Sequence, residues 1–137
     1  MAAPRVLDDA RLAAPQRQWR AAMGLLLPMG IGAAPALRSL GDLPLCAFKH
    51  LTGVPCPLCG GIRVCAALAQ GDVSAAFVHN PGLLPLLAVA ALHSGLLLSE
   101  AVSGRRLGTP PALTLAWKVA GGILLFSWLW RVSGWPA

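Results

Sequence analysis

Charged and acidic side chains are scarce in this chain of 137 residues. Charged residues make up 12% of the sequence, only five residues are acidic, and tyrosine is absent. Soluble domains carry about twice this share of charge, so an ordinary soluble domain is excluded. Five scattered carboxylates are also too few to build a paired-carboxylate site.

The sequence also lacks the common motifs of catalysis and nucleotide binding. It contains no Walker loop, no dinucleotide-binding glycine motif, no Gly-x-Ser-x-Gly and no His-Glu-x-x-His. These absences leave no sequence signature for the corresponding nucleotide-binding, serine-hydrolase and zinc-protease classes. Whether the protein is an enzyme stays open on the sequence alone.

Apolar residues dominate what is present. They make up 56% of the chain, and the net charge is +6. The basic residues stand between apolar runs and form no basic face, so they mark the ends of membrane spans. We therefore expect a lipid bilayer as the environment and no nucleic-acid partner. The apolar content also excludes intrinsic disorder.

Three apolar stretches are long enough to cross a bilayer. A helix rises about 1.5 Å per residue, so roughly 20 residues cross a hydrocarbon core about 30 Å thick. The sequence predicts an all-α membrane protein with three transmembrane helices and one or two short interfacial helices between the first and second. The expected spans are about 21–37, 81–101 and 112–130. Residues 1–20 are then a tail, and residues 21–137 a single membrane domain.

The first stretch is marginal, because it is short and contains Pro28 and Pro35. A secretory signal peptide is the alternative, with a small-residue cleavage site at Ala34-Pro35-Ala36. The preceding segment is long for such a signal, and proline is awkward inside a cleavage triplet. A retained helix is therefore the prediction.

The basic residues also predict the orientation, because cytoplasmic loops carry more Lys and Arg. One side of the membrane would hold seven: Arg5, Arg11, Arg17, Arg20, Arg105, Arg106 and Lys118. The other side would hold four: Arg38, Lys49, Arg63 and Arg131. We expect a cytoplasmic N-terminus, with the first connection, residues 38–80, on the far side.

All four cysteines lie inside this connection, within one stretch of twenty residues of a Cys-rich segment at 45–80: Cys46, Cys56, Cys59 and Cys65. The turn Cys56-Pro57-Leu58-Cys59 is followed by two glycines and a predicted helix over 62–70. Gly71 should end that helix in a left-handed conformation, and Asp72 should cap a short helix, Val73–His79. Asn80 should cap the second span, with Pro81 as its first residue.

This segment resembles a known family over roughly residues 45–98. The run from Cys46 through Cys-Pro-x-Cys-Gly and Arg63 to Gly71-Asp72 and Asn80-Pro81 is similar to small bacterial membrane proteins grouped as domain-of-unknown-function family 2752. Leu58 stands where glycine is common in that family, and Ile62 where threonine is common, so no threonine hydroxyl can act there. The resemblance implies a multi-pass protein of the bacterial inner membrane and brings no established activity.

The cysteine turn allows three interpretations. Cys59 precedes a helix, whose dipole favours an anion, and Arg63 adds positive charge one turn later, so both favour thiolate. Cys56 and Cys59 could then form a redox pair or a disulfide. Alternatively, they could bind zinc or another thiophilic metal with Cys46 and either His50 or Cys65. Cys65 is the weaker ligand, because six helical residues turn it about 240° from Cys59. In the third interpretation the cysteines are structural.

Ionisable residues at membrane depth also need an explanation. His79, His93 and Glu100 are spaced to share one stripe of a continuous helix. They could form a proton or metal-ion relay running toward Glu100. In the simpler interpretation, which we favour, neutral His93 makes one hydrogen bond to a neighbouring helix, while His79 and Glu100 lie at the two interfaces in water.

The leading hypothesis is therefore a small accessory membrane protein whose Cys-Pro-x-Cys site does thiol-redox or metal chemistry at the extracytoplasmic surface. The tentative thiol site is Cys56, Cys59 and Arg63. The competing hypothesis is a non-enzymatic scaffold in which the turn is purely structural. Small residues would let helices approach closely, for self-association or for binding another membrane protein. These residues are Ala91, Gly95, Gly121 and Gly122.

Overall fold

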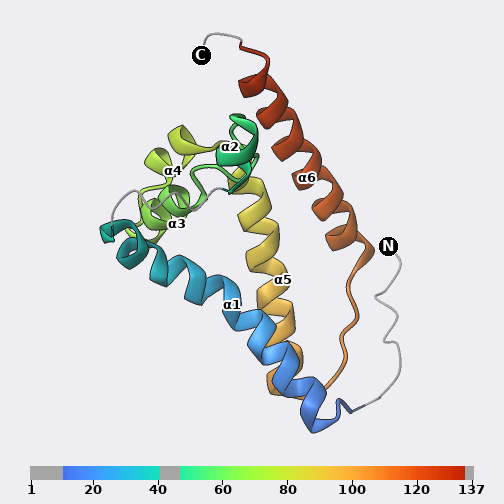
Figure 1. Cartoon of the computed structure of the whole chain (residues 1–137). Helices are drawn as coiled ribbons and strands as arrows, with labels where there is room; N and C mark the ends of the chain where they lie inside the picture. The colour runs from blue at the N-terminus through green and yellow to red at the C-terminus, as the bar shows by residue number, and fades with distance from the viewer. Residues whose placement is uncertain (1–10, 41–46, 135–137) are drawn as a thin grey trace.

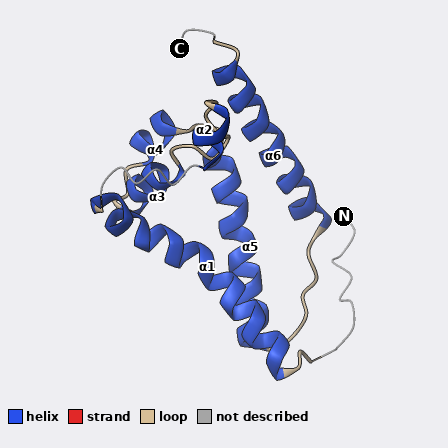
Figure 2. Ribbon diagram, viewed as in Figure 1, coloured by secondary structure: helices blue, strands red, loops and turns tan. Residues whose placement is uncertain are grey.

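The structure, a computed structural model, describes residues 11–40 and 47–134, and these residues contain six α-helices (Figures 1 and 2). They are α1 (Ala14–Ser39), α2 (Ala47–Thr52), α3 (Gly61–Ala69), α4 (Val73–His79), α5 (Leu83–Ser103) and α6 (Pro111–Val132). The described residues contain no β-strand, and a single isolated bridge pairs Arg11 with Arg105. The all-α prediction is confirmed, with the short helices between the first and second long ones.

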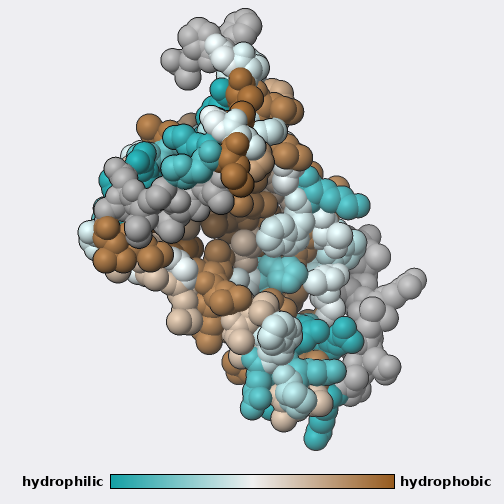
Figure 3. Space-filling view, in the orientation of Figure 1, coloured by the Kyte–Doolittle hydropathy of each residue, from teal (hydrophilic) through white to brown (hydrophobic). Residues whose placement is uncertain are grey.

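Three of the helices, α1, α5 and α6, are long and apolar enough to cross a membrane. Most of their apolar surface is exposed in the isolated chain. Figure 3 shows hydrophilic residues gathered at the lower end, where α1 begins and α5 ends, with hydrophobic residues above them. An exposed apolar surface of this extent is what a lipid-facing protein requires. The chain is a small multi-pass membrane protein.

The central element is α5, which packs against α1 on one side and α6 on the other (Figure 1). Helices α1 and α5 meet near the end where α1 begins, and they diverge toward the other end. There α3 packs against α1, and α4 packs against α3. A buried cluster joins α3, α4, α5 and α6 at this end: Val64, Ala67, Ala76, Leu83 and Leu124.

The first long helix is longer than its sequence suggested. The sequence suggested a marginal stretch at 21–37, but α1 is 26 residues long and continues through Pro28 and Pro35. Pro15 lies in its first turn. Pro15 suits that position, because its fixed φ is helical and its missing N–H would have no helical partner. The polar first turns of α1, which the apolar pattern did not include, are therefore part of the same helix.

The expected caps between α3 and α4 are confirmed. Gly71 adopts a φ of +77°, and the Asp72 carboxylate accepts hydrogen bonds from the Ala75 N–H at 2.9 Å and the Ser74 hydroxyl at 2.7 Å. These hydrogen bonds, led by the one from Ala75, lower the pKa of Asp72. Local backbone conformation and hydrogen bonding therefore end α3 and begin α4, as the sequence indicated.

The predicted cap of the second span is wrong. Asn80 is extended and ends α4, and α5 begins three residues later, at Leu83, after Gly82. The Asn80 side chain contacts the cysteine turn and α6 instead of capping α5. Because the helix is interrupted here, His79 belongs to α4 and cannot share a stripe of α5 with His93.

The close helix contacts involve other glycines than expected. Gly95, Gly121 and Gly122 have open space where a side chain would lie. Instead, Gly24 brings α1 against Leu98 of α5, and Gly82 brings the start of α5 against α6. A Cβ atom at residue 82 would lie 2.8 Å from the Ser127 Cβ and 3.1 Å from the Leu124 Cα. The α5–α6 packing therefore requires glycine at position 82.

We predict that Gly82→Ala destabilises the protein by about 1–3 kcal/mol, because the added methyl forces α5 and α6 apart. Thermal unfolding in detergent, followed by circular dichroism, measures the change. The matched control is Gly95→Ala, within α5 and facing open space, which should be neutral or stabilising. Equal melting temperatures for Gly82→Ala and the wild type would contradict the packing.

Candidate functional site

A hydrogen-bonded turn carries the two central cysteines. The Cys59 N–H donates to the Cys56 carbonyl at 2.9 Å, with Pro57 at the second position, where its fixed φ suits a turn. Gly60 follows with a φ of +87°, a conformation that favours glycine, and α3 begins at Gly61. Cys59 therefore lies two residues before the helix, close to the position expected.

The sulfur atoms of Cys56 and Cys59 face each other across this turn. Their Sγ atoms are 3.6 Å apart, and both side chains are half-buried. A disulfide bond is about 2.05 Å long, so the pair lies at the distance of hydrogen-bonded thiols. The turn thus brings together the two cysteines of the predicted pair.

Asn80 connects this turn to the rest of the protein. Its side-chain Nδ2 donates to the carbonyl oxygens of Pro57 at 3.1 Å and Cys59 at 3.4 Å. Its Oδ1 accepts from the guanidinium of Arg131, in the last turn of α6, at 2.5 Å. Asn80 is completely buried, with 0% of its surface exposed. One amide therefore joins the turn, the α4–α5 junction and the end of α6.

A second contact from α6 holds the start of the same turn. The indole Nε1 of Trp128 donates to the carbonyl of Pro55 at 2.5 Å. Three carbonyls of this segment, at positions 55, 57 and 59, are thus bonded to side chains from distant parts of the chain. We name Asn80, Trp128 and Arg131 the turn clamp.

The other predicted site residues lie around this turn in different ways. Arg63 is exposed in the first turn of α3, and His50 is exposed on α2. Cys46 lies outside the described residues. Within 11–40 and 47–134 no group of three His, Cys, Asp or Glu side chains is placed to hold a metal ion. The predicted metal site, whose ligands include Cys46, stays a prediction.

Cys65 faces a different surface. It lines an apolar cavity of about 350 Å³ between α3 and α1, together with residues that include Ile62, Leu27 and Ile31. Burial in this environment raises the pKa of the Cys65 thiol, which disfavours thiolate there. Cys65 therefore has the surroundings of a structural cysteine.

Residues 46–93 match the model of a family described as "Protein of unknown function (DUF2752)". Over this segment the chain is similar to that family. Searches of curated proteins and of solved structures give no match. The DUF2752 segment contains the cysteine turn and Asn80, whereas Trp128 and Arg131 lie beyond its end. The clamp therefore joins the DUF2752 segment to a helix outside it.

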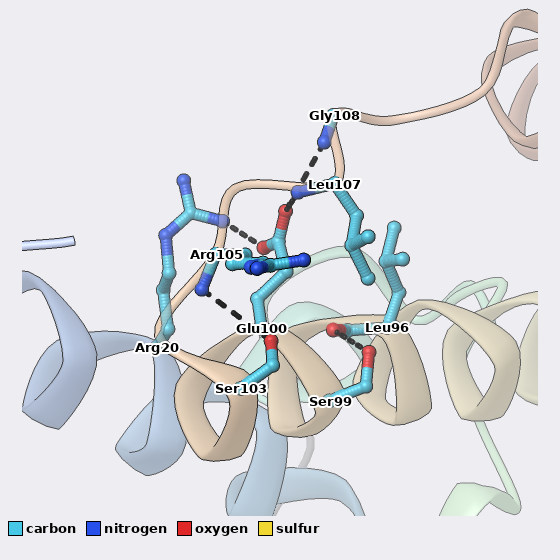
Figure 4. Close-up of polar contacts among 8 residues, drawn as sticks. All are labelled: Arg20, Leu96, Ser99, Glu100, Ser103, Arg105, Leu107 and Gly108. Carbon is cyan, nitrogen blue, oxygen red and sulfur yellow. Dashed lines mark hydrogen bonds and ion pairs between the residues drawn. The ribbon is translucent and has the colours of Figure 1, made fainter. Parts of the chain in front are cut away.

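Glu100, beyond the DUF2752 segment, does not lie in water as expected. It is 2% exposed and forms an ion pair with Arg20 of α1 (Figure 4). Its other carboxylate oxygen accepts hydrogen bonds from the backbone N–H groups of Leu107 at 2.8 Å and Gly108 at 3.2 Å. The expectation failed because the α5–α6 connection folds back over the carboxylate. Glu100 therefore joins α1, α5 and that connection.

His93, the last residue of the DUF2752 match, makes the single contact predicted for it. Its Nδ1 accepts a hydrogen bond from the indole Nε1 of Trp117 on α6 at 3.2 Å, and the two rings meet edge to face. The contact supports the interpretation of His93 as a residue bonded to a neighbouring helix.

We predict that Asn80→Ala lowers the free energy of unfolding by about 1–3 kcal/mol, because two half-buried carbonyls and the Arg131 guanidinium lose their partner. Chemical denaturation in detergent micelles measures this change. Gln70→Ala, which removes an exposed amide at the end of α3, is the control and should stay within about 0.5 kcal/mol of the wild type. If Asn80→Ala is as stable as that control, the clamp does not contribute to the free energy of unfolding.

Proposed function

We propose that Cys56 and Cys59 form a redox-active dithiol at the extracytoplasmic surface of the membrane, where they exchange with disulfides of another protein. The observation that carries this proposal is the 3.6 Å separation of the two sulfurs within a clamped turn. A preformed pair needs little backbone movement to close a disulfide, since cysteines with suitably placed Cβ atoms can be bridged directly.

The proposed reaction is a thiol–disulfide exchange. One thiolate of the pair attacks a sulfur of the partner's disulfide and releases the first partner thiol. The second cysteine then attacks the mixed disulfide, forms the Cys56–Cys59 bond and releases the second partner thiol. The dithiol loses two electrons and two protons, and the partner disulfide gains them. Arg63, in the first turn of the following helix, would favour the thiolate form.

The proposed location follows from the distribution of charge. The end where α1 begins and α5 ends carries Arg20, Arg105 and Arg106, and the cysteine turn lies near the opposite end of α5 (Figure 1). The excess of basic residues supports a cytoplasmic N-terminus in the inner membrane. The turn would then face an oxidising compartment, where disulfides persist.

Two other functions predict different chemistry. A zinc or other thiophilic metal site would use Cys56 and Cys59 with Cys46 and His50 as its further ligands. A non-enzymatic scaffold would use the turn as a rigid connector. The scaffold has one observation in its favour, because the clamp holds backbone carbonyls rather than the sulfurs.

The test uses the variant Cys46→Ser/Cys65→Ser, which keeps only the proposed pair. We expect two maleimide-reactive thiols in this purified protein under reduced glutathione, none under oxidised glutathione, and a Cys56–Cys59 cross-linked peptide by mass spectrometry. The transition should be reversible, because the turn holds the sulfurs close in both states.

The control adds Cys59→Ser, which should abolish the intramolecular cross-link and leave a mixed disulfide with glutathione. On intact cells, a membrane-impermeant maleimide should label Cys56 and Cys59 after reduction. Two thiols that stay reactive under oxidised glutathione would overturn the redox proposal in favour of the scaffold. Stoichiometric zinc in the wild-type protein would overturn it in favour of the metal site.

A further inference from the structure

A basic hollow lies at the end of the molecule where α1 begins. Its volume is about 340 Å³, and it is lined by Pro15, Gln16, Trp19 and Arg20 of α1 and by Arg106 of the α5–α6 connection. The lining therefore provides two guanidinium groups, an amide and an indole, and among the described residues no carboxylate lines it. We propose that this hollow, the arginine pocket, binds the phosphate group of an anionic membrane lipid.

The pocket is a built feature, because hydrogen bonds hold its two segments together. The Leu12 N–H donates to the Gly104 carbonyl at 2.9 Å, just before α1 begins and just after α5 ends. The Arg17 guanidinium donates to the carbonyl of Ala101 at 3.0 Å. These contacts join the start of α1 to the end of α5 and to the connection that carries Arg106.

The charge at this end favours an anion. Five arginines gather among its described residues: Arg11, Arg17, Arg20, Arg105 and Arg106. Glu100 is the one carboxylate among residues 11–22 and 100–110, and its oxygens already accept bonds from Arg20 and two backbone N–H groups. Arg17 binds neutral carbonyls, which leave its charge uncompensated. The pocket therefore lies in a strongly positive region.

The position of the pocket favours a lipid as the source of the phosphate. It opens where two helices long enough to span a membrane come together, at the hydrophilic lower end in Figure 3. Trp19 is 65% exposed beside it, and tryptophan is enriched at the level of lipid headgroups. Guanidinium groups bind phosphate oxygens through paired hydrogen bonds. This inference does not depend on the function of the cysteines.

The experiment measures lipid adducts on the intact, detergent-solubilised protein by native mass spectrometry. Phosphatidylglycerol should bind in preference to phosphatidylcholine with the same acyl chains. Arg106→Gln should weaken phosphatidylglycerol binding roughly tenfold, because it removes a charged hydrogen-bond donor. Arg38→Gln makes the same charge change at the opposite end of α1 and should leave binding unchanged.

Both arginines are exposed, so both variants should have the melting temperature of the wild type in lipid-free detergent. Trp19→Ala provides a second test and should weaken binding several-fold. Equal loss in Arg38→Gln and Arg106→Gln would show attraction by net charge alone and overturn the pocket. Displacement of the lipid by millimolar inorganic phosphate would identify free phosphate as the ligand and overturn the lipid assignment.

Discussion

The buried amide of Asn80 constrains the site more than any other single group. An amide removed from water must find hydrogen-bond partners, and in lipid this requirement is strict because no solvent can replace them. Asn80 meets the requirement through two backbone carbonyls of the cysteine turn and the guanidinium of Arg131. The same bonds that satisfy the amide therefore fix the turn that places the Cys56 and Cys59 sulfurs together.

A second buried polar group acts at the opposite end of α5. Glu100 joins α5 to the first turns of α1 through Arg20, whereas Asn80 joins the start of α5 to the last turn of α6 through Arg131. Each outer helix is therefore fastened to the central one at a different end. This arrangement explains why α1 diverges from α5 toward the cysteine turn, where α3 packs between them and α4 packs against α3 (Figure 1).

The sequence predicted features that depend on local order and missed those that depend on distant partners. Helix type, the Gly71 and Asp72 caps, the cysteine turn and the contact of His93 with another helix follow from residue spacing and membrane energetics. Asn80 was misassigned because Asn-Pro is also a helix-start signal, and its partner Arg131 is 51 residues away. Glu100 was placed in water because no local pattern reveals a connection that folds over it. The available signal was an asparagine directly before an apolar span.

The reduction potential of the Cys56–Cys59 couple in Asn80→Asp, compared with the wild type, tests the central claim most directly. This change retains an oxygen for Arg131 and removes the two N–H donors that hold the turn. If the clamp keeps the sulfurs together, loss of the donors disfavours the disulfide, and the potential becomes less negative by about 30 mV for each tenfold loss in the equilibrium constant. An unchanged potential would show that the amide does not organise the pair.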